Sequence, residues 1–400
     1  MFQFIDNGSV TSVQGIQAAG INCGIKKSKK DLALIYSDVP CEAAGTFTLN
    51  KVVAAPLVLS KNIIQQKKKV KAILVNSGNA NACTGDEGFK DAIQMQKSCA
   101  ESLGIKQDEI LISSTGVIGQ KLPMDALLSG IKTISTSLSD DGGLNAAEAI
   151  MTTDKKMKSF AVKVQLKKGE VTIGGICKGS GMIAPNMATM LAFLTTDAEI
   201  DKASLKNVFV KAIDNSFNKI SVDGETSTND MCIIMSNGMS GININDSENL
   251  GAFSEALNAI CIQMAKSIVA DGEGATKLVT VNVKNAKSKN DANLIGKSIA
   301  NSSLVKTAIH GEDANWGRIM SAAGQSGADI EPNKVAISFN DLSVLQPNFS
   351  LTLNEKLATQ ILTQPEFVIN IDIGLGKEET TWWTCDLSEE YIRINADYRT

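Results

Sequence analysis

The sequence has a single histidine, His310, among 400 residues, and this scarcity excludes several common catalytic designs. A Ser-His-Asp triad or a histidine-rich metal site would have to use that one residue. The polar segment "GEDANWGR" follows it and is typical of a turn and a helix start, so we interpret His310 as a surface or capping residue. Histidine chemistry is therefore not expected to carry the function.

Several other signals are also missing. The eight cysteines are scattered, with no C-x-x-C pair, so no structural zinc site is expected and the thiols are expected to be reduced and mostly buried. Because the net charge is −4 and no large basic patch is present, nucleic-acid binding is not expected. The short runs "KKSKK" and "QQKKKVK" are interpreted as a solvated loop and a solvated helix end. No apolar run reaches membrane-spanning length and the start lacks a secretory pattern, which favours a cytoplasmic location.

Nucleotide-binding motifs are absent or weak. There is no Walker-type phosphate loop, and residues 179–184, "GSGMIA", fit only the loose G-x-G-x-x-A pattern of dinucleotide-binding loops. Pro185 follows at once, where the helix of such a site should already be running. Dinucleotide binding is therefore a minor alternative.

The pattern of helices and strands favours a layered α+β fold. A buried strand is predicted at 70–76, a helix ending near Gly104, and a hairpin at 160–179. Further strands are predicted at 276–285, 332–340 and 365–375. Because helices and strands are mixed and several strands form hairpins, layers of both are expected rather than a purely parallel sheet.

Residues 179–198 are Gly-rich, then apolar, and contain Thr189 in the run "MATMLAFLTT". One interpretation is a buried strand in which Thr189 packs. The other is a threonine freed by cleavage of the backbone. Such a threonine carries its own base, because its α-amine, with a pKa near ~8, can take the hydroxyl proton. An enzyme of this kind needs no histidine, but it does need donors for an oxyanion.

Blocks along the whole chain resemble the ornithine acetyltransferases (glutamate N-acetyltransferases) of arginine biosynthesis. The central block is "KGSGMIAPNMATMLAF", at 178–193. The other blocks are "LVNSGNANACTG", "SSTGVIGQKLPMD", "AIMTTD", "SVDGETSTND", "VADGEGATKL", "DANWGRIMSAAG" and "INADYRT". The resemblance implies a layered α/β sandwich shared with DmpA-type aminopeptidases. It also implies self-cleavage between Ala188 and Thr189 into chains 1–188 and 189–400, assembled as a heterotetramer of two α and two β chains.

Residue roles follow from the same resemblance. Thr189 matches the nucleophile, and Thr115 and Gly116 match the oxyanion hole. The matched substrate contacts, in addition to Thr189, are Thr153, Lys178, Glu273, Asn395 and Thr400. No metal or organic cofactor is implied, although acetyl-CoA is a possible second acetyl donor in this family. Glu225 and Asp230 are open between a supporting role and a plain turn, and neither His310 nor Glu312 receives a role.

The implied reaction is transfer of an acetyl group from N-acetylornithine to glutamate through an acetyl ester on Thr189. Two alternatives stay open. One is a DmpA-like amidase in which water takes the acyl group. The other is an uncleaved ligand-binding relative without activity.

Overall fold

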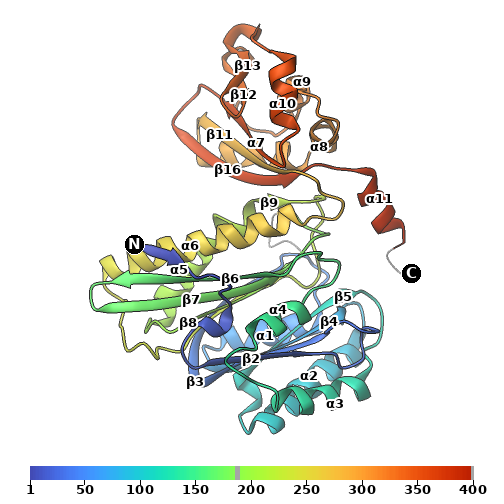
Figure 1. Ribbon diagram of the computed structural model, residues 1–400, viewed down its shortest axis with the longest axis vertical. Helices are drawn as coiled ribbons and strands as arrows, with labels where there is room; N and C mark the ends of the chain where they lie inside the picture. The colour runs from blue at the N-terminus through green and yellow to red at the C-terminus, as the bar shows by residue number, and fades with distance from the viewer. Residues whose placement is uncertain (185–189, 398–400) are drawn as a thin grey trace. The chain divides into compact units, whose positions relative to one another are not determined.

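The computed structural model describes residues 1–184 and 190–397, which form two compact units (Figure 1). The described part of the first unit comprises residues 1–179, 190–218 and 226–268, and that of the second comprises 180–184, 219–225 and 269–397. These units do not coincide with the chains 1–188 and 189–400 expected from cleavage, because strands from both sides of residue 189 pair in one sheet. No described helix is long and apolar enough to cross a membrane.

The first unit is built on a nine-stranded sheet in the order β1-β6-β7-β8-β10-β3-β4-β5, with β2 paired to β3. Its strands are β1 (Phe2–Phe4), β2 (Ile16–Ile21), β3 (Leu32–Phe47), β4 (Val70–Asn79), β5 (Ile110–Val117), β6 (Lys158–Leu166), β7 (Gly169–Lys178), β8 (Leu191–Thr196) and β10 (Met231–Ser236). The long strand β3 connects two layers, because its first half pairs with β2 and β4 and its second half with β10. The predicted hairpin is confirmed as β6 and β7.

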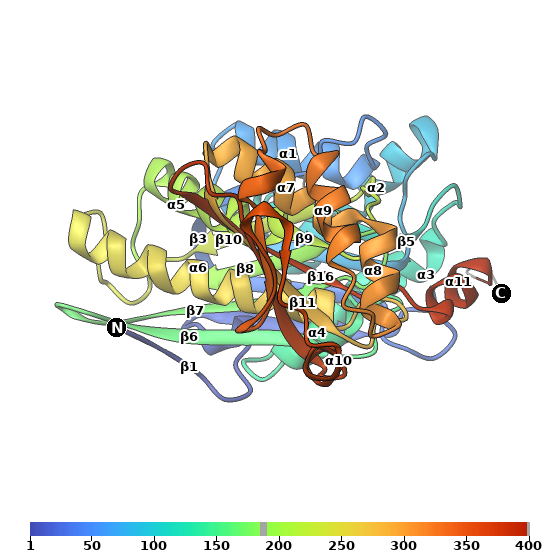
Figure 2. The same cartoon turned by 90° about the horizontal axis from the view of Figure 1, so that it is seen from above.

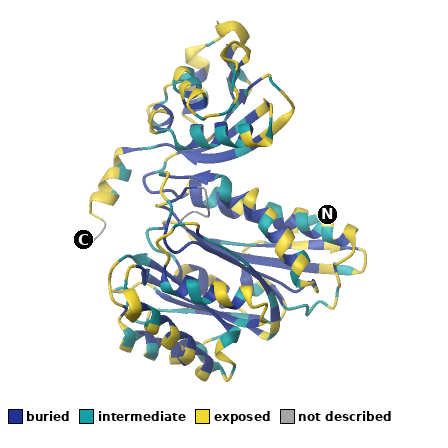
Figure 3. Ribbon diagram, turned by 180° about the vertical axis from the view of Figure 1, so that it is seen from behind, coloured by how far each residue is buried: buried dark blue, intermediate teal, exposed yellow. Residues whose placement is uncertain are grey.

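Helices pack against the faces of these two layers (Figure 1). They are α1 (Ala55–Gln65), α2 (Gly85–Leu103), α3 (Met124–Ser135), α4 (Gly143–Ala149), α5 (Lys202–Asp214) and α6 (Ser247–Ala270). Successive side chains of a strand point to opposite faces of the sheet, which lets one strand contribute to two core layers. Leu32, Leu34, Leu74 and Ile112 lie in the core against α2 and α3. Their sequence neighbours, such as Ala33, Ile35, Val75 and Leu111, lie in the core between the two sheet layers. The expected layered sandwich is confirmed, with its strands buried and its helices half exposed (Figure 3).

The second unit contains a seven-stranded sheet in the order β14-β13-β12-β15-β11-β16-β9. Its strands are β9 (Ile220–Ser221), β11 (Leu278–Ala286), β12 (Ala336–Phe339), β13 (Leu342–Gln346), β14 (Ser350–Leu351), β15 (Glu366–Asp372) and β16 (Glu378–Cys385). Its helices are α7 (Lys289–Asn301), α8 (Ser303–His310), α9 (Trp316–Gly324), α10 (Glu355–Leu362) and α11 (Glu389–Ala396). Helices α7, α8 and α9 lie side by side (Figure 2). The three strands predicted in this region are confirmed as β11, β12 and β15.

Candidate functional site

The segment "STG" lies at the carboxyl end of β5, beside the end of the parallel strand β4. Thr115 is opposite Ser77, and Gly116 is opposite Gly78. Gly116 has a φ of +132°, and a Cβ there would lie 2.3 Å from the carbonyl carbon of Gly78. Only glycine fits such a close approach of two backbones. The sequence therefore builds a tight loop next to the buried side chain of Thr115.

Asparagine side chains hold this loop in place. The Asn76 amide donates to the Asn79 carbonyl (2.9 Å), and the Ser114 hydroxyl donates to Asn76 Oδ1 (2.5 Å). Asn229, from the other sheet layer, donates to the carbonyls of Ala80 (2.6 Å) and Ser114 (2.8 Å). These buried amides hold the loop in place through hydrogen bonds, and an oxyanion site needs donors that are preorganised in this way.

Lys178 ends β7 in a buried group of charges. The neighbouring amide of Gly179 donates to Asp154 Oδ1 (2.8 Å), which also accepts from Lys158 Nζ (2.7 Å). Asp154 Oδ2 accepts from the Thr152 amide (3.0 Å), so the chain neighbours of Thr153 and Lys178 are both bound to this carboxylate. Burial would raise the pKa of Asp154, but the ammonium groups of Lys178 and Lys158 hold it well below its usual value. The carboxylate is therefore ionised.

Lys26 interacts electrostatically with Lys178 and Asp154, and it was not predicted to be a site residue. It is half-buried, and its ammonium donates to the carbonyls of Met151 (2.6 Å) and Lys30 (3.0 Å). Burial lowers the pKa of Lys26 to about 8, and repulsion from Lys178 contributes in the same direction. The interpretation of "KKSKK" as a solvated loop is wrong for this residue, since a contact 125 positions away decides its environment. Nothing in the local sequence distinguishes it from Lys27.

The expected cleavage bond lies outside the described residues, as do both its residues, Ala188 and Thr189, and the substrate contact Thr400. Description resumes at Met190, immediately before β8. The Met190 amide donates to Oδ1 of Asp230 (3.0 Å), which is almost fully buried. Burial raises the pKa of the Asp230 carboxyl well above its usual value. Asp230 therefore binds a segment 40 positions earlier in the chain, in addition to its place in its own turn.

In the second unit, Glu273 and Asn395 are brought together from 122 positions apart. The Asn395 amide donates to Glu273 Oε2 (2.9 Å), and the Glu273 amide donates to the Ser180 carbonyl (2.8 Å). A Cβ on Gly181 would lie 2.4 Å from Glu273 Oε2, so this segment approaches the carboxylate closely. Glu225 is exposed and donates its amide to Asp223 (3.1 Å), which fits a plain turn.

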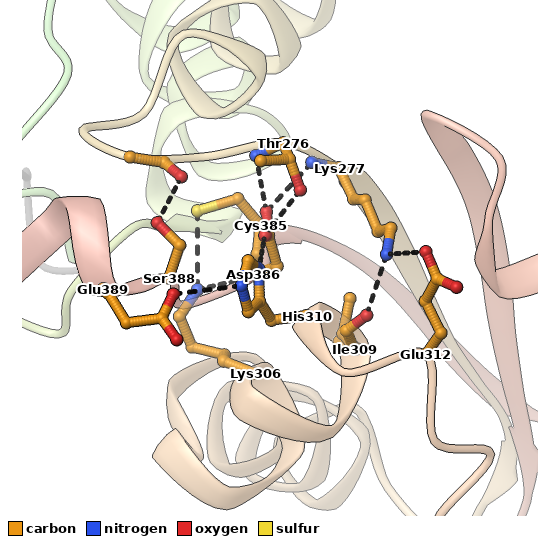
Figure 4. A network of polar contacts seen from close by, with 11 residues as sticks. Thr276, Lys277, Lys306, Ile309, His310, Glu312, Cys385, Asp386, Ser388 and Glu389 are labelled. Carbon is orange, nitrogen blue, oxygen red and sulfur yellow. Dashed lines mark hydrogen bonds and ion pairs between the residues drawn. The ribbon is translucent and has the colours of Figure 1, made fainter.

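His310 belongs to a polar network that includes Thr276 and Lys277, which follow Glu273 in the sequence (Figure 4). The buried carboxylate of Asp386 accepts from the amides of Thr276 (2.7 Å) and Lys277 (2.9 Å) and pairs with His310 Nδ1 (2.8 Å). Burial would raise the pKa of Asp386, but these hydrogen bonds lower it below its usual value. The interpretation of His310 as a surface or capping residue fits its place at the end of α8, where its side chain is 33% exposed. It is half-buried, and with Asp386 it braces the chain that follows Glu273.

Cysteine and metal chemistry find little support in the described residues. Six of the eight cysteines are buried, as expected, and all eight are free thiols. Burial raises the pKa of Cys99 and Cys177 to about 12, so these thiols are poor nucleophiles. No group of three or more histidine, cysteine, aspartate or glutamate side chains suited to a metal ion occurs in residues 1–184 and 190–397.

Comparison with known proteins places these residues in a family context. The profile described as "ArgJ family" matches residues 17–400. The "Arginine biosynthesis bifunctional protein ArgJ" of Oceanobacillus iheyensis is 46% identical over 398 residues, covering 99% of this chain and 97% of that protein. The crystal structure of ArgJ from Bacillus halodurans is 42% identical, with a TM-score of 0.44, over 46% of this chain and 97% of that one. An L-aminopeptidase D-Ala-esterase/amidase from Ochrobactrum anthropi is 11% identical, with a TM-score of 0.43, over 66% and 86% of the two chains.

Proposed function

The chain belongs to the ArgJ family, and on this premise we propose that it transfers the acetyl group of N-acetylornithine to glutamate in arginine biosynthesis. The observation that carries the proposal is the identity of 46% with a curated arginine-biosynthesis protein along almost the entire chain. The hydrogen-bonded loop at Thr115 and Gly116 supports it, because acyl transfer requires fixed donors beside the reacting carbonyl.

In the proposed mechanism, the precursor first cuts itself between Ala188 and Thr189. The hydroxyl of Thr189 then attacks the amide carbonyl of N-acetylornithine and gives its proton to its own α-amine. The Thr115 hydroxyl and the Gly116 amide stabilise the oxyanion that forms. Ornithine leaves with the proton that the α-amine took up. The amine of glutamate then attacks the acetyl ester, the bond between the acetyl group and the Thr189 oxygen breaks, and a proton from the glutamate amine returns to that oxygen.

Charge supports an acidic substrate. Lys158 and Lys178 act on the carboxylate of Asp154, and Lys26 lies close enough to Lys178 for repulsion to lower its pKa, so several cationic groups gather in this part of the first unit. We assign Lys178 and Thr153 to the α-carboxylate that N-acetylornithine and glutamate share. Glu273, held by Asn395, is assigned to an ammonium group of the substrate. Thr400 is assigned to substrate binding on the family resemblance alone.

The proposed enzyme consists of an α chain, 1–188, and a β chain, 189–400, in a cytoplasmic heterotetramer of two of each. Pairing of β7 with β8 supports lasting association, since these strands lie on opposite sides of the cut. No metal or organic cofactor takes part in the proposed steps. The relatives' name includes the word "bifunctional", and we propose acetyl-CoA as a second acetyl donor. Formation of N-acetylglutamate from glutamate and acetyl-CoA alone tests that point.

The choice of acceptor tests the proposal against an amidase. With N-acetylornithine as donor, glutamate should be acetylated much faster than free acetate accumulates, because the glutamate amine competes with water for the ester. Product analysis of one reaction measures both rates. Release of acetate at an equal rate with and without glutamate would identify an amidase. No turnover of either kind, in an uncleaved chain, would favour the ligand-binding relative.

The pH dependence of activity tests the identity of the base. The α-amine of Thr189 must be neutral, so kcat/KM should rise with pH through one ionisation at or below ~8. The His310→Gln enzyme should keep this rising limb, because His310 is paired with Asp386 and takes no part in proton transfer. The lost contact should instead lower thermal stability. Loss of the limb and of most of kcat, in a folded and cleaved variant, would make His310 the base.

A further inference from the structure

Asn229 and Asp230 are consecutive residues in the turn before β10, and their side chains hold two different segments of the first unit. Asn229 donates to the carbonyls of Ala80 (2.6 Å) and Ser114 (2.8 Å). The Ser114 carbonyl belongs to the peptide unit that joins Ser114 to Thr115. Asn229 therefore holds the peptide unit that directly precedes the proposed oxyanion donors.

Asp230 reaches in the other direction, to the start of β8. Strands β8 and β10 are parallel with Met231 opposite Leu191, so Asp230 lies opposite Met190. Asp230 Oδ1 accepts from the Met190 amide (3.0 Å), and the Met231 amide donates to the Met190 carbonyl (3.2 Å). The Met190 amide belongs to the peptide unit whose carbonyl is that of Thr189. This unit stays intact when the bond before Thr189 is cut.

We propose that Asn229 and Asp230 are the positioning pair of the acyl-transfer site. One holds the oxyanion loop, and the other holds the peptide unit that follows the nucleophile. Because the two residues share one peptide bond, the two segments cannot drift apart independently. Acyl transfer is sensitive to displacements of about 1 Å, so this link contributes to rate rather than to substrate binding. The inference rests on the proposed function, since it takes Thr189 as the nucleophile.

The described side-chain contact of Asp230 needs one acceptor oxygen in a fixed place, and a group of the same shape can supply it. The side chain is 1% exposed, and Oδ2 receives no hydrogen bond from any residue in the described ranges. Burial raises the pKa of this carboxyl well above its usual value. A carboxyl and a carboxamide have the same shape, and both offer an oxygen to the Met190 amide. Asparagine should therefore replace Asp230, whereas alanine should not.

The test compares Asp230→Ala with Asp230→Asn in the full-length chain. Cleavage is followed on a denaturing gel, and kcat and KM are measured for the cleaved fraction with N-acetylornithine and glutamate. Asp230→Ala should slow cleavage and lower kcat by at least about tenfold, with KM little changed. Asp230→Asn should stay within about threefold of the parent chain in both. An Asp230→Asn chain as slow as Asp230→Ala would mean that a carboxyl proton or charge is required, and would overturn the inference.

Asp197 provides a matched control at the other end of β8. It is also buried, and its Oδ1 accepts one backbone hydrogen bond, from the Thr172 amide (2.8 Å). Asp197→Ala should lower the melting temperature to a similar degree but leave cleavage and kcat unchanged. Equal slowing by Asp197→Ala would show that general loosening of β8 explains the effect, and the positioning role would be lost.

Asn229→Ala tests the other member of the pair, and does so even if Asp230→Ala does not fold. It should also lower kcat with KM little changed, because only the hold on the oxyanion loop is removed. Cleavage and kcat equal to those of the parent chain would overturn the inference. Failure of the proposed function is distinguishable, because the unmodified chain itself would then show no cleavage or no acetyl transfer.

Discussion

Replacing Thr189 with alanine should leave a single chain of 42.4 kDa and no acetyl transfer. In the proposed mechanism one hydroxyl performs two reactions, cleavage of the Ala188–Thr189 bond and attack on the substrate amide. Removing this hydroxyl eliminates both reactions, because the alanine side chain has no oxygen that could attack either bond. A denaturing gel measures cleavage, and an assay of N-acetylglutamate formation measures transfer.

Two further variants separate chemistry from folding. Thr189→Ser keeps a hydroxyl and should still be cleaved. Thr195→Ala removes a buried hydroxyl of β8 that donates to the Val10 carbonyl (2.8 Å), and should be cleaved despite lower stability. The new N-terminus of the parent chain should be Thr189 by sequencing. Cleavage of the Thr189→Ala chain, or a different N-terminus, would require another nucleophile.

The two products should remain together after cleavage. Strand β7, before the cut, pairs along six residues with β8, after it, from Ile173 opposite Thr196 to Lys178 opposite Leu191. Because β8 is also paired with β10, the cut leaves the sheet intact in its middle. Continuity of the sheet, and not of the chain, therefore holds Lys178 near the start of the proposed β chain.

Most of the fold could be predicted from periodicity. The alternation in "VKAILVN" places Val75 and Leu74 on opposite faces, and both faces are covered in the structure. The C-cap at Gly104, with a φ of +66°, follows from glycine's tolerance of the left-handed region. The division into two units could not be predicted, because β9 lies in the second unit while the strands next to it in sequence, β8 and β10, lie in the first.

The site was only partly predictable, and the reason is the distance along the chain over which its contacts act. Asp154 holds Gly179 from 25 positions away, and Asp230 holds Met190 from 40. In the sequence alone each is one of many aspartates in polar turns. Thr115 and Gly116 were identified only through the family resemblance, since "SSTGVIG" by itself resembles an ordinary turn after a strand. Burial and pairing, which distinguish these residues, exist only in the folded chain.

Thr115→Ala should lower kcat for acetyl transfer by about 10²–10³-fold, the usual loss for one oxyanion donor and equivalent to about 2.7–4 kcal/mol. The side chain is buried at the end of β5, beside the tight approach of Gly116 to Gly78. An oxyanion exists only in the transition state and the intermediate, so KM should change little. Steady-state kinetics of the cleaved fraction measures both constants.

The neighbouring Ser113 supplies a control for this last experiment. It lies two residues earlier on the same face of β5, and its buried hydroxyl has no hydrogen-bond partner in the described part of the chain. Ser113→Ala should therefore keep the parent kcat, and Thr115→Ser, which retains a hydroxyl, should recover most of the lost rate. An effect of Thr115→Ala confined to KM would place this residue in ground-state binding of the substrate. An equal loss of kcat in Ser113→Ala would instead indicate that the strand end, and not the Thr115 hydroxyl, is what the reaction depends on.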